Sequence, residues 1–170
     1  MILKPIDLDP DLYFKSFIDN LKDLDLITAL ERSKNETIQL MKQVPKAKEA
    51  FAYAEGKWNA KQLFQHLVDC ERIFSFRALS IGRLDPLNLP AFDEDLYVRN
   101  DFTHTMNLTD ICKDYEIARD SFTSLIKSLN PKVLDNFGLA NNISISPRIV
   151  AWFNVGHNDH HNRIFRERYL

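Results

Sequence analysis

Four long segments of this chain carry apolar residues at every third or fourth position, and no other feature limits its fold as strongly. A stripe at that spacing runs along one side of an α-helix, so each segment predicts an amphipathic helix. The segments cover residues 24–44, 59–82, 107–130 and 146–170. Only Ile143-Ser144-Ile145 alternates as a strand would, and it is too short to predict one. The pattern therefore predicts an all-α four-helix bundle.

Capping and helix-stopping residues support these boundaries. Ser146-Pro147 suits the start of the last helix, because the serine hydroxyl can accept from the first turn and proline gives up a donor that is not needed there. Asn59 followed by Gln62 forms a reasonable N-cap pair for the second helix. Pro45 and Pro131 end the first and third helices.

The connections are predicted to differ in length. Residues 1–11 are expected to form an extended arm that leads into a short helix near residues 13–20. Residues 85–106 make the longest connection, with a helical turn expected around residues 94–98. A loop of that length in a compact domain is often functional, or else it travels the length of the bundle.

Composition excludes several classes of partner. The 170 residues are expected to form one domain, 1–170, and the net charge of -2 gives no general attraction to nucleic acid or to an anionic membrane. The sequence shows no signal peptide and no apolar run long enough to span a bilayer, so the expected location is cytoplasmic. Cys70 and Cys112 lack the spacing of a zinc ribbon or a redox motif, and reduced thiols are expected.

Histidines provide the strongest functional signal. His157 and His161 are four positions apart on the last helix, so their imidazoles lie on one face about 6 Å apart along the axis. His66 lies on the inward stripe of the second helix and can face this pair if the two helices pack together. Three neutral imidazoles with an open fourth position are typical of a catalytic zinc site. We therefore predict that His66, His157 and His161 bind a divalent metal ion.

Nearby residues receive weaker predictions. His160 points about 100° away from its neighbour in the pair, which favours packing over ligation. Cys70 lies one turn beyond His66 and could be a soft ligand, but a buried free cysteine is more often a small hydrophobe. Asp69 could orient the imidazole of His66 or could equally be exposed. His104 is expected on a surface loop.

A zinc-protease helix is disfavoured, although the histidine pair has its i, i+4 spacing. The residue after the first histidine is Asn158, where the protease motif needs a glutamate as general base. Asn158 and Asn162 also fall outside the apolar stripe of the last helix. No other residue can be assigned as a general base from the sequence.

Taken together, these motifs resemble the DinB-like superfamily, including its YfiT-like branch, whose members are described as metal-dependent hydrolases. The resemblance covers nearly the whole chain from the first long helix onward and rests on Lys57-Trp58-Asn59, Gln65-His66-Leu67-Val68-Asp69 with Glu71, Ala91-Phe92-Asp93-Glu94-Asp95, Gly156-His157, His160-His161 and Arg166-Glu167-Arg168-Tyr169. It implies a four-helix bundle with two long crossover connections, and a nickel or zinc ion held by His66, His157 and His161. Characterised relatives use the metal to activate a low-molecular-weight thiol for transfer or isomerisation.

Two hypotheses for function follow. The first is a metal-dependent enzyme, a hydrolase or a thiol S-transferase, that acts on a small-molecule substrate by activating water or a low-molecular-weight thiol at the three-histidine site. The second is a non-catalytic helical-bundle binding protein with a vestigial or structural metal site. An open cavity at the histidines would favour the enzyme, whereas a filled one would favour the binding protein. A homodimer formed through helix faces is compatible with either hypothesis.

Overall fold

The computed structural model describes residues 1–5, 8 and 12–170, so part of the predicted N-terminal arm, at 6–7 and 9–11, lies outside the described residues. The predicted short helix is α1 (Lys15–Asp19), and the predicted turn in the longest connection is α4 (Glu94–Arg99). The body of the molecule consists of α2 (Leu26–Gln43), α3 (Ala60–Gly82), α5 (Leu108–Ser128) and α6 (Pro147–Arg168). The all-α four-helix bundle is therefore confirmed.

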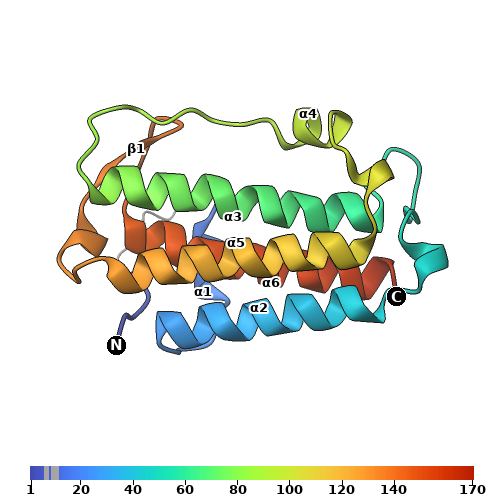
Figure 1. The fold of residues 1–170 in the computed structure, drawn as a ribbon. Coiled ribbons are helices and arrows are strands. Elements are labelled where there is room, and N and C mark those ends of the chain that lie inside the picture. The colour runs from blue at the N-terminus through green and yellow to red at the C-terminus, as the bar shows by residue number, and fades with distance from the viewer. Residues whose placement is uncertain (6–7, 9–11) are drawn as a thin grey trace.

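Helices that follow one another along the chain, α2 with α3 and α5 with α6, lie diagonally opposite each other in the bundle. Both α2 and α3 pack against α5 and α6, while α2 with α3 and α5 with α6 are not among the closely packed pairs of these four described helices. Figure 1 shows that α3 and α5 run in the same direction, opposite to α2 and α6. The connection between the parallel helices α3 and α5, residues 83–107, therefore crosses the full length of the bundle, and we call it the crossover. The other two connections pass over opposite ends of the bundle, so these four described helices have one long crossover where the family resemblance implied two (Figure 1).

Predicted capping residues make the expected bonds. The Asn59 side chain accepts from the Gln62 N–H at 3.0 Å and the Gln62 side chain accepts from the Asn59 N–H at 3.0 Å, which completes a capping box. At the start of α6 the Ser146 hydroxyl accepts from the Ile149 N–H at 3.3 Å, with Pro147 as the first helical residue. These local bonds fix where the two histidine-bearing helices begin.

The sequence analysis predicted no strand in the connection before α6, and this prediction is wrong. Strands β1 (Gly138–Ala140) and β2 (Ile143–Ile145) form an antiparallel hairpin. Its turn residues Asn141 and Asn142 have φ values of 53° and 61°, the left-handed conformation that a two-residue hairpin turn needs and that asparagine tolerates. Leu89 of the crossover pairs with this hairpin, donating to the Leu139 carbonyl at 2.9 Å. The hairpin thus anchors the crossover.

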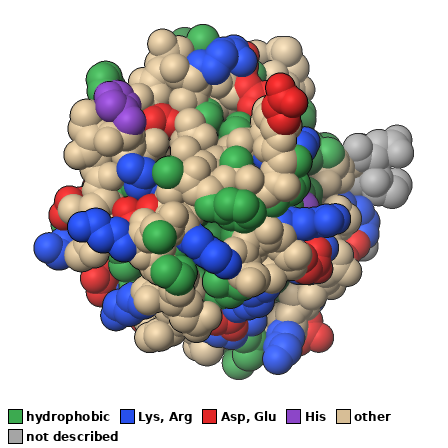
Figure 2. All heavy atoms as spheres, turned by 90° about the vertical axis from the view of Figure 1, so that its right-hand side faces the viewer, with side chains coloured by type: hydrophobic (Ala, Val, Ile, Leu, Met, Phe, Trp, Pro, Cys, Tyr) green, Lys and Arg blue, Asp and Glu red, His purple; other side chains and the backbone are tan. Residues whose placement is uncertain are grey.

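Surface charge is mixed in sign. Figure 2 shows the end of the bundle near the C-terminus, where basic and acidic side chains alternate over the face and neither sign gathers into a single patch. This agrees with the net charge of -2. Among the described helices, none combines the length and the apolar character needed to cross a membrane.

Candidate metal centre

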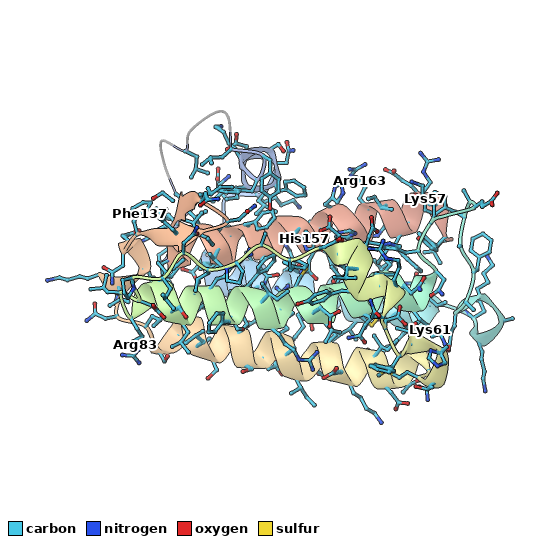
Figure 3. The ribbon with its side chains drawn as sticks, turned by 90° about the horizontal axis from the view of Figure 1, so that it is seen from above. Lys57, Lys61, Arg83, Phe137, His157 and Arg163 are labelled. Atoms are coloured by element: carbon cyan, nitrogen blue, oxygen red, sulfur yellow. The ribbon has the colours of Figure 1, made fainter. Side chains whose placement is uncertain are left out.

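The structure brings the three predicted histidines together. His66 projects from α3, and His157 and His161 project from α6 one turn apart. The Nε2 atom of His157 lies 3.2 Å from Nε2 of His66 and 3.1 Å from Nε2 of His161. All three ligand atoms lie within 4.8 Å of one another, and Figure 3 shows His157 on α6 close to the path of the crossover.

The donor set fits a divalent ion. Two imidazole nitrogens that bind one zinc ion at about 2.0–2.1 Å in tetrahedral geometry lie about 3.3 Å apart, close to both measured Nε2–Nε2 distances. Burial lowers the pKa of His66 to about 4, and burial, followed by the neighbouring histidines, holds the pKa values of His157 and His161 well below the usual range. At neutral pH all three rings are therefore uncharged, which is the form that binds metal.

Aromatic packing, rather than hydrogen bonds at Nδ1, holds the rings of His157 and His161 in place. Within the described residues, Nδ1 of His157 and Nδ1 of His161 are buried and have no hydrogen-bond partner. The His157 ring instead contacts Phe153 and Phe74, with ring centroids 5.7 and 5.8 Å away. His66 packs against Trp58 at 4.9 Å. Aromatic side chains therefore take the orienting role that carboxylates or carbonyls usually have around ligating histidines.

Trp58 also ties the histidine region to the crossover. Its indole N–H donates to the Asp95 carboxylate of α4 at 3.0 Å. Asp93 caps the same short helix by accepting from the Leu96 N–H at 2.9 Å. The Trp58–Asp95 bond therefore holds α4 beside the N-terminal end of α3, close to the ring of His66.

A cavity of about 390 Å³ opens beside the histidines, within the size range of small-molecule sites. Its walls come from the region of α1, from α3 and α6, from the crossover and from the hairpin. Most of the lining is apolar or aromatic, including Phe14, Phe17, Phe74, Phe92, Ile149 and Phe153. The three histidines and Cys70 lie in the same lining, so the cluster faces space that a small molecule can enter.

The weaker sequence predictions have separate outcomes. His160 lines the cavity but is not part of the three-residue cluster, and its ring packs against Phe17 with centroids 5.1 Å apart. The Cys70 thiol lies 3.6 Å from Nε2 of His66, and burial, followed by the charge of Glu71, raises its pKa well above the usual range. Cys70 is therefore a protonated side chain in the cavity wall at neutral pH.

Asp69 and His104 have no contact with the cluster in the described structure. The Asp69 carboxylate accepts from the Gln65 amide at 3.0 Å, and no bond joins it to His66 among the described residues. The hypothesis that Asp69 orients the imidazole thus finds no support in the hydrogen bonds. His104 is exposed in a short 3₁₀ turn, Thr103–Thr105, as expected for a surface loop.

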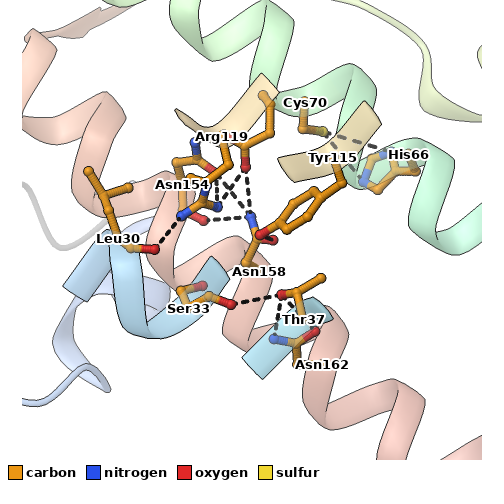
Figure 4. Close-up of polar contacts among 11 residues, drawn as sticks. Leu30, Ser33, Thr37, His66, Cys70, Tyr115, Arg119, Asn154, Asn158 and Asn162 are labelled. Atoms are coloured by element: carbon orange, nitrogen blue, oxygen red, sulfur yellow. Dashed lines mark hydrogen bonds and ion pairs between the residues drawn. The ribbon is translucent and has the colours of Figure 1, made fainter. Parts of the chain in front are cut away.

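Sequence reasoning missed a buried polar network directly behind the histidines. Glu71 of α3 and Arg119 of α5 form an ion pair at 2.6 Å with neither side chain exposed. The amide of Asn154 donates to the other oxygen of Glu71 at 2.9 Å, and Asn158 donates to the first at 3.3 Å. Tyr115 donates to Asn158 at 2.9 Å, and Figure 4 shows these groups converging from separate helices.

A second buried contact continues the same face of α6. Asn162 donates to the hydroxyl of Thr37 on α2 at 2.9 Å. Asn154, Asn158 and Asn162 are spaced by four and are all fully buried, so α6 has one buried polar face and a separate histidine face. The spacing of four between these asparagines could have indicated a shared face in the sequence. Polar residues at helical spacing are usually solvated, however, and the partners that bury these asparagines include residues on other helices.

Comparisons with known proteins agree with this architecture. The family model described as the DinB superfamily matches residues 29–165. The solved structure of YfiT from Bacillus subtilis, described as "a probable metal-dependent hydrolase with an unusual four-helix bundle topology", superposes with a TM-score of 0.73 at 16% identity, over 96% of this chain and 90% of that one. No curated protein matched the chain. The family match spans most of the sequence, and the chain belongs to the DinB superfamily.

Proposed function

We propose that this protein is a divalent-metal-dependent enzyme whose ion is held by His66, His157 and His161. The observation that carries the proposal is that three Nε2 atoms converge in the wall of an open cavity large enough for a small-molecule substrate. The description of YfiT as "a probable metal-dependent hydrolase" agrees with it. We further propose that the enzyme is a hydrolase or a thiol S-transferase.

Zinc and nickel are the proposed ions, because both accept imidazole ligands. His66, His157 and His161 would hold the ion, which would supply a nucleophile at neutral pH by lowering the pKa of water to about 7 or by favouring the thiolate form of a low-molecular-weight thiol. The protein contributes uncharged imidazoles, whose lowered pKa values prevent protons from competing for the ligand atoms.

The remaining side chains shape the reaction space. The aromatic walls make the lining largely apolar, and an apolar surrounding strengthens electrostatic interactions between a substrate and the site. Asn158 takes no part in the cavity, because its amide bonds to Glu71 and to the backbone and side chain of Asn154. A zinc-protease mechanism with a base at that position is thus disfavoured by geometry as well as by chemistry.

The open cavity favours an enzyme over a non-catalytic binding protein, because a scaffold needs no space in front of its histidines. A low-molecular-weight thiol and an electrophile, or a single hydrolysable substrate, would both have access to the ligand atoms. The cavity is compatible with both hydrolysis and thiol transfer, so the experiment tests both reactions.

Metal analysis of untagged protein tests the proposal. We expect one equivalent of zinc or nickel in the wild type and its loss in His161→Ala. His160→Ala is the matched control, since its ring is one residue away but outside the cluster, and it should retain the metal. Metal-free protein that binds neither ion on titration would overturn the proposal. Loaded and stripped samples are then compared on ester and amide substrates and on thiols paired with electrophiles.

A further inference from the structure

Arg77 contributes a positive charge to the cavity wall, and it is not one of the three proposed metal ligands. It is the single lysine or arginine among the described residues that line the cavity. The side chain is half-buried on α3, facing walls that are otherwise largely apolar. A guanidinium in such a place is poorly solvated, and burial lowers the pKa of Arg77 accordingly.

The guanidinium has unused hydrogen-bonding capacity. It donates to the Pro90 carbonyl of the crossover at 3.0 Å and lies over the ring of Phe92, 5.9 Å from the centroid. A guanidinium has five N–H donors, so most of them remain available. Within the part of the chain that the structure describes, no carboxylate lies at ion-pair distance from Arg77.

Among the described lining residues, Glu94 is the other side chain that carries a full charge at neutral pH. It is exposed on α4, the helix that Trp58 holds beside His66 through Asp95. Within the described residues, no ion pair joins Glu94 to Arg77. The carboxylate of Glu94 is therefore not paired with the guanidinium of Arg77.

Arg77 and the histidines lie at different places along the cavity. Eleven residues separate His66 from Arg77 on α3, which corresponds to about 16 Å along a helix axis. Phe74 lies between them on α3 and contacts the His157 ring at 5.8 Å. A ligand that reached both positions would be elongated and would pass over an apolar middle section.

We propose that the cavity binds an elongated substrate with an apolar body and a terminal carboxylate, which pairs with Arg77 while the reacting group lies at the histidines. A carboxylate fits better than a phosphate dianion, because the lining residues that the structure describes include one Lys or Arg and a carboxylate balances its charge. The inference rests on the proposed function for the position of the reacting group. The carboxylate contact with Arg77 can be measured separately from it.

A purely structural role for Arg77 is the competing explanation, since its bond to Pro90 could do no more than fasten the crossover. The two roles differ in what they change. A fastening role predicts a loss of stability on substitution without any change in which ligands bind. A carboxylate-binding role predicts a selective change between a charged ligand and its neutral analogue.

Calorimetric titration of the metal-loaded protein with 5-phenylpentanoate and with 5-phenylpentanamide separates these roles. We expect the wild type to bind the carboxylate roughly 10-fold or more tightly than the amide, as a charge-assisted hydrogen bond provides. Arg77→Gln should remove that preference, and Arg77→Lys should keep part of it. Arg83→Gln is the matched control, because Arg83 follows α3, is exposed and lies outside the cavity lining, and it should keep the full preference.

The same titrations on metal-stripped protein distinguish failure of this inference from failure of the proposed function. A carboxylate preference that persists without metal and disappears in Arg77→Gln supports the inference even if no activity is found. A preference that disappears on stripping and survives in Arg77→Gln means that the carboxylate binds the ion, and it overturns the inference. Equal binding of both probes by the wild type, or no binding of either, overturns it as well.

Discussion

Arg119 and Glu71 are joined across the bundle by a 2.6 Å ion pair from which solvent is completely excluded. Asn154 and Asn158 of α6 bond to the same carboxylate, so Glu71 of α3 is joined to both α5 and α6. Because buried charges require these partners, the network fixes the rotation of α6 about its axis. His157 precedes Asn158, and its direction toward the cavity follows from that rotation.

The first prediction is that Arg119→Met strongly destabilises the protein. The substitution leaves the Glu71 carboxylate buried without its cation, and breaking a buried pair in this way costs roughly 3–5 kcal/mol of unfolding free energy. Urea unfolding monitored by circular dichroism gives the change. Adding Glu71→Gln to the same chain should recover part of the loss, because the unpaired charge is then removed.

Arg72→Met is the control for this experiment. Arg72 neighbours Glu71 on α3 and pairs with Asp114, but both of those side chains are solvent-accessible. Exposed pairs contribute about 0–1 kcal/mol, so the control should unfold almost as the wild type does. Equal losses of unfolding free energy in Arg119→Met and Arg72→Met would show that the buried ion pair contributes no more to stability than the exposed one.

The second prediction concerns the stability of the metal-free protein in acid. The pKa of His66 is lowered to about 4 in the folded protein and is about 6.5 in an unfolded chain. Between these values the unfolded chain binds more protons, so stability falls as the pH drops from 6.5 toward 4. For His66 alone the loss amounts to about 3 kcal/mol at pH 4 and below.

Unfolding free energies measured between pH 6.5 and pH 4 test the direction of the change in stability and the pH range over which it occurs. His157 and His161 shift in the same direction, so the complete cluster should steepen the decline. His66→Gln removes one titrating group and should flatten the curve between pH 6.5 and 4. A wild-type protein that became more stable over the same interval would contradict the lowered pKa values.

The helices and the histidine cluster could be predicted because their signals are local. The spacing of four between His157 and His161 fixes a shared helix face without any knowledge of the fold. Placing His66 opposite them needed one further assumption, that α3 and α6 are neighbours, and the structure shows that they are. That the cluster binds an ion stays a prediction.

The hairpin, the buried polar network and the cavity could not be predicted, because they depend on contacts between segments that are distant in the sequence. The Asn141-Asn142 turn favours positive φ, but strands of three residues bury too little to be distinguished from coil by periodicity. Asn158 falls outside the apolar stripe of its helix, and its burial is explained by partners that include Glu71 and Tyr115 on other helices. The cavity likewise exists because the crossover and the hairpin lie over α3, which no local pattern encodes.

The third prediction is that Cys70 is unreactive and is not needed for metal binding. Burial raises its pKa well above the usual range, so very little thiolate is present at pH 7, and thiolate is the reactive form. Ellman's reagent should therefore label Cys112, which is only partly buried, much faster than Cys70 in the native protein. Both thiols should react in denaturant. Cys70→Ala should keep its metal, and a variant that lost it would place the sulfur among the ligands.

The fourth prediction is that Gly156 cannot be replaced by alanine without a cost. A Cβ at this position would come within 2.8 Å of the Phe17 carbonyl carbon, because the backbone of α1 packs directly on α6 there. Overpacking of this kind costs roughly 1–3 kcal/mol, which exceeds the gain of about 1 kcal/mol that alanine brings to a helix. Gly82→Ala is the matched control, since the nearest atoms that its Cβ would meet belong to side chains, Val133 at 3.3 Å and Leu129 at 3.6 Å. Thermal unfolding should therefore show a clear drop for Gly156→Ala and little change for Gly82→Ala, because a side-chain tip can move aside and the backbone of α1 cannot.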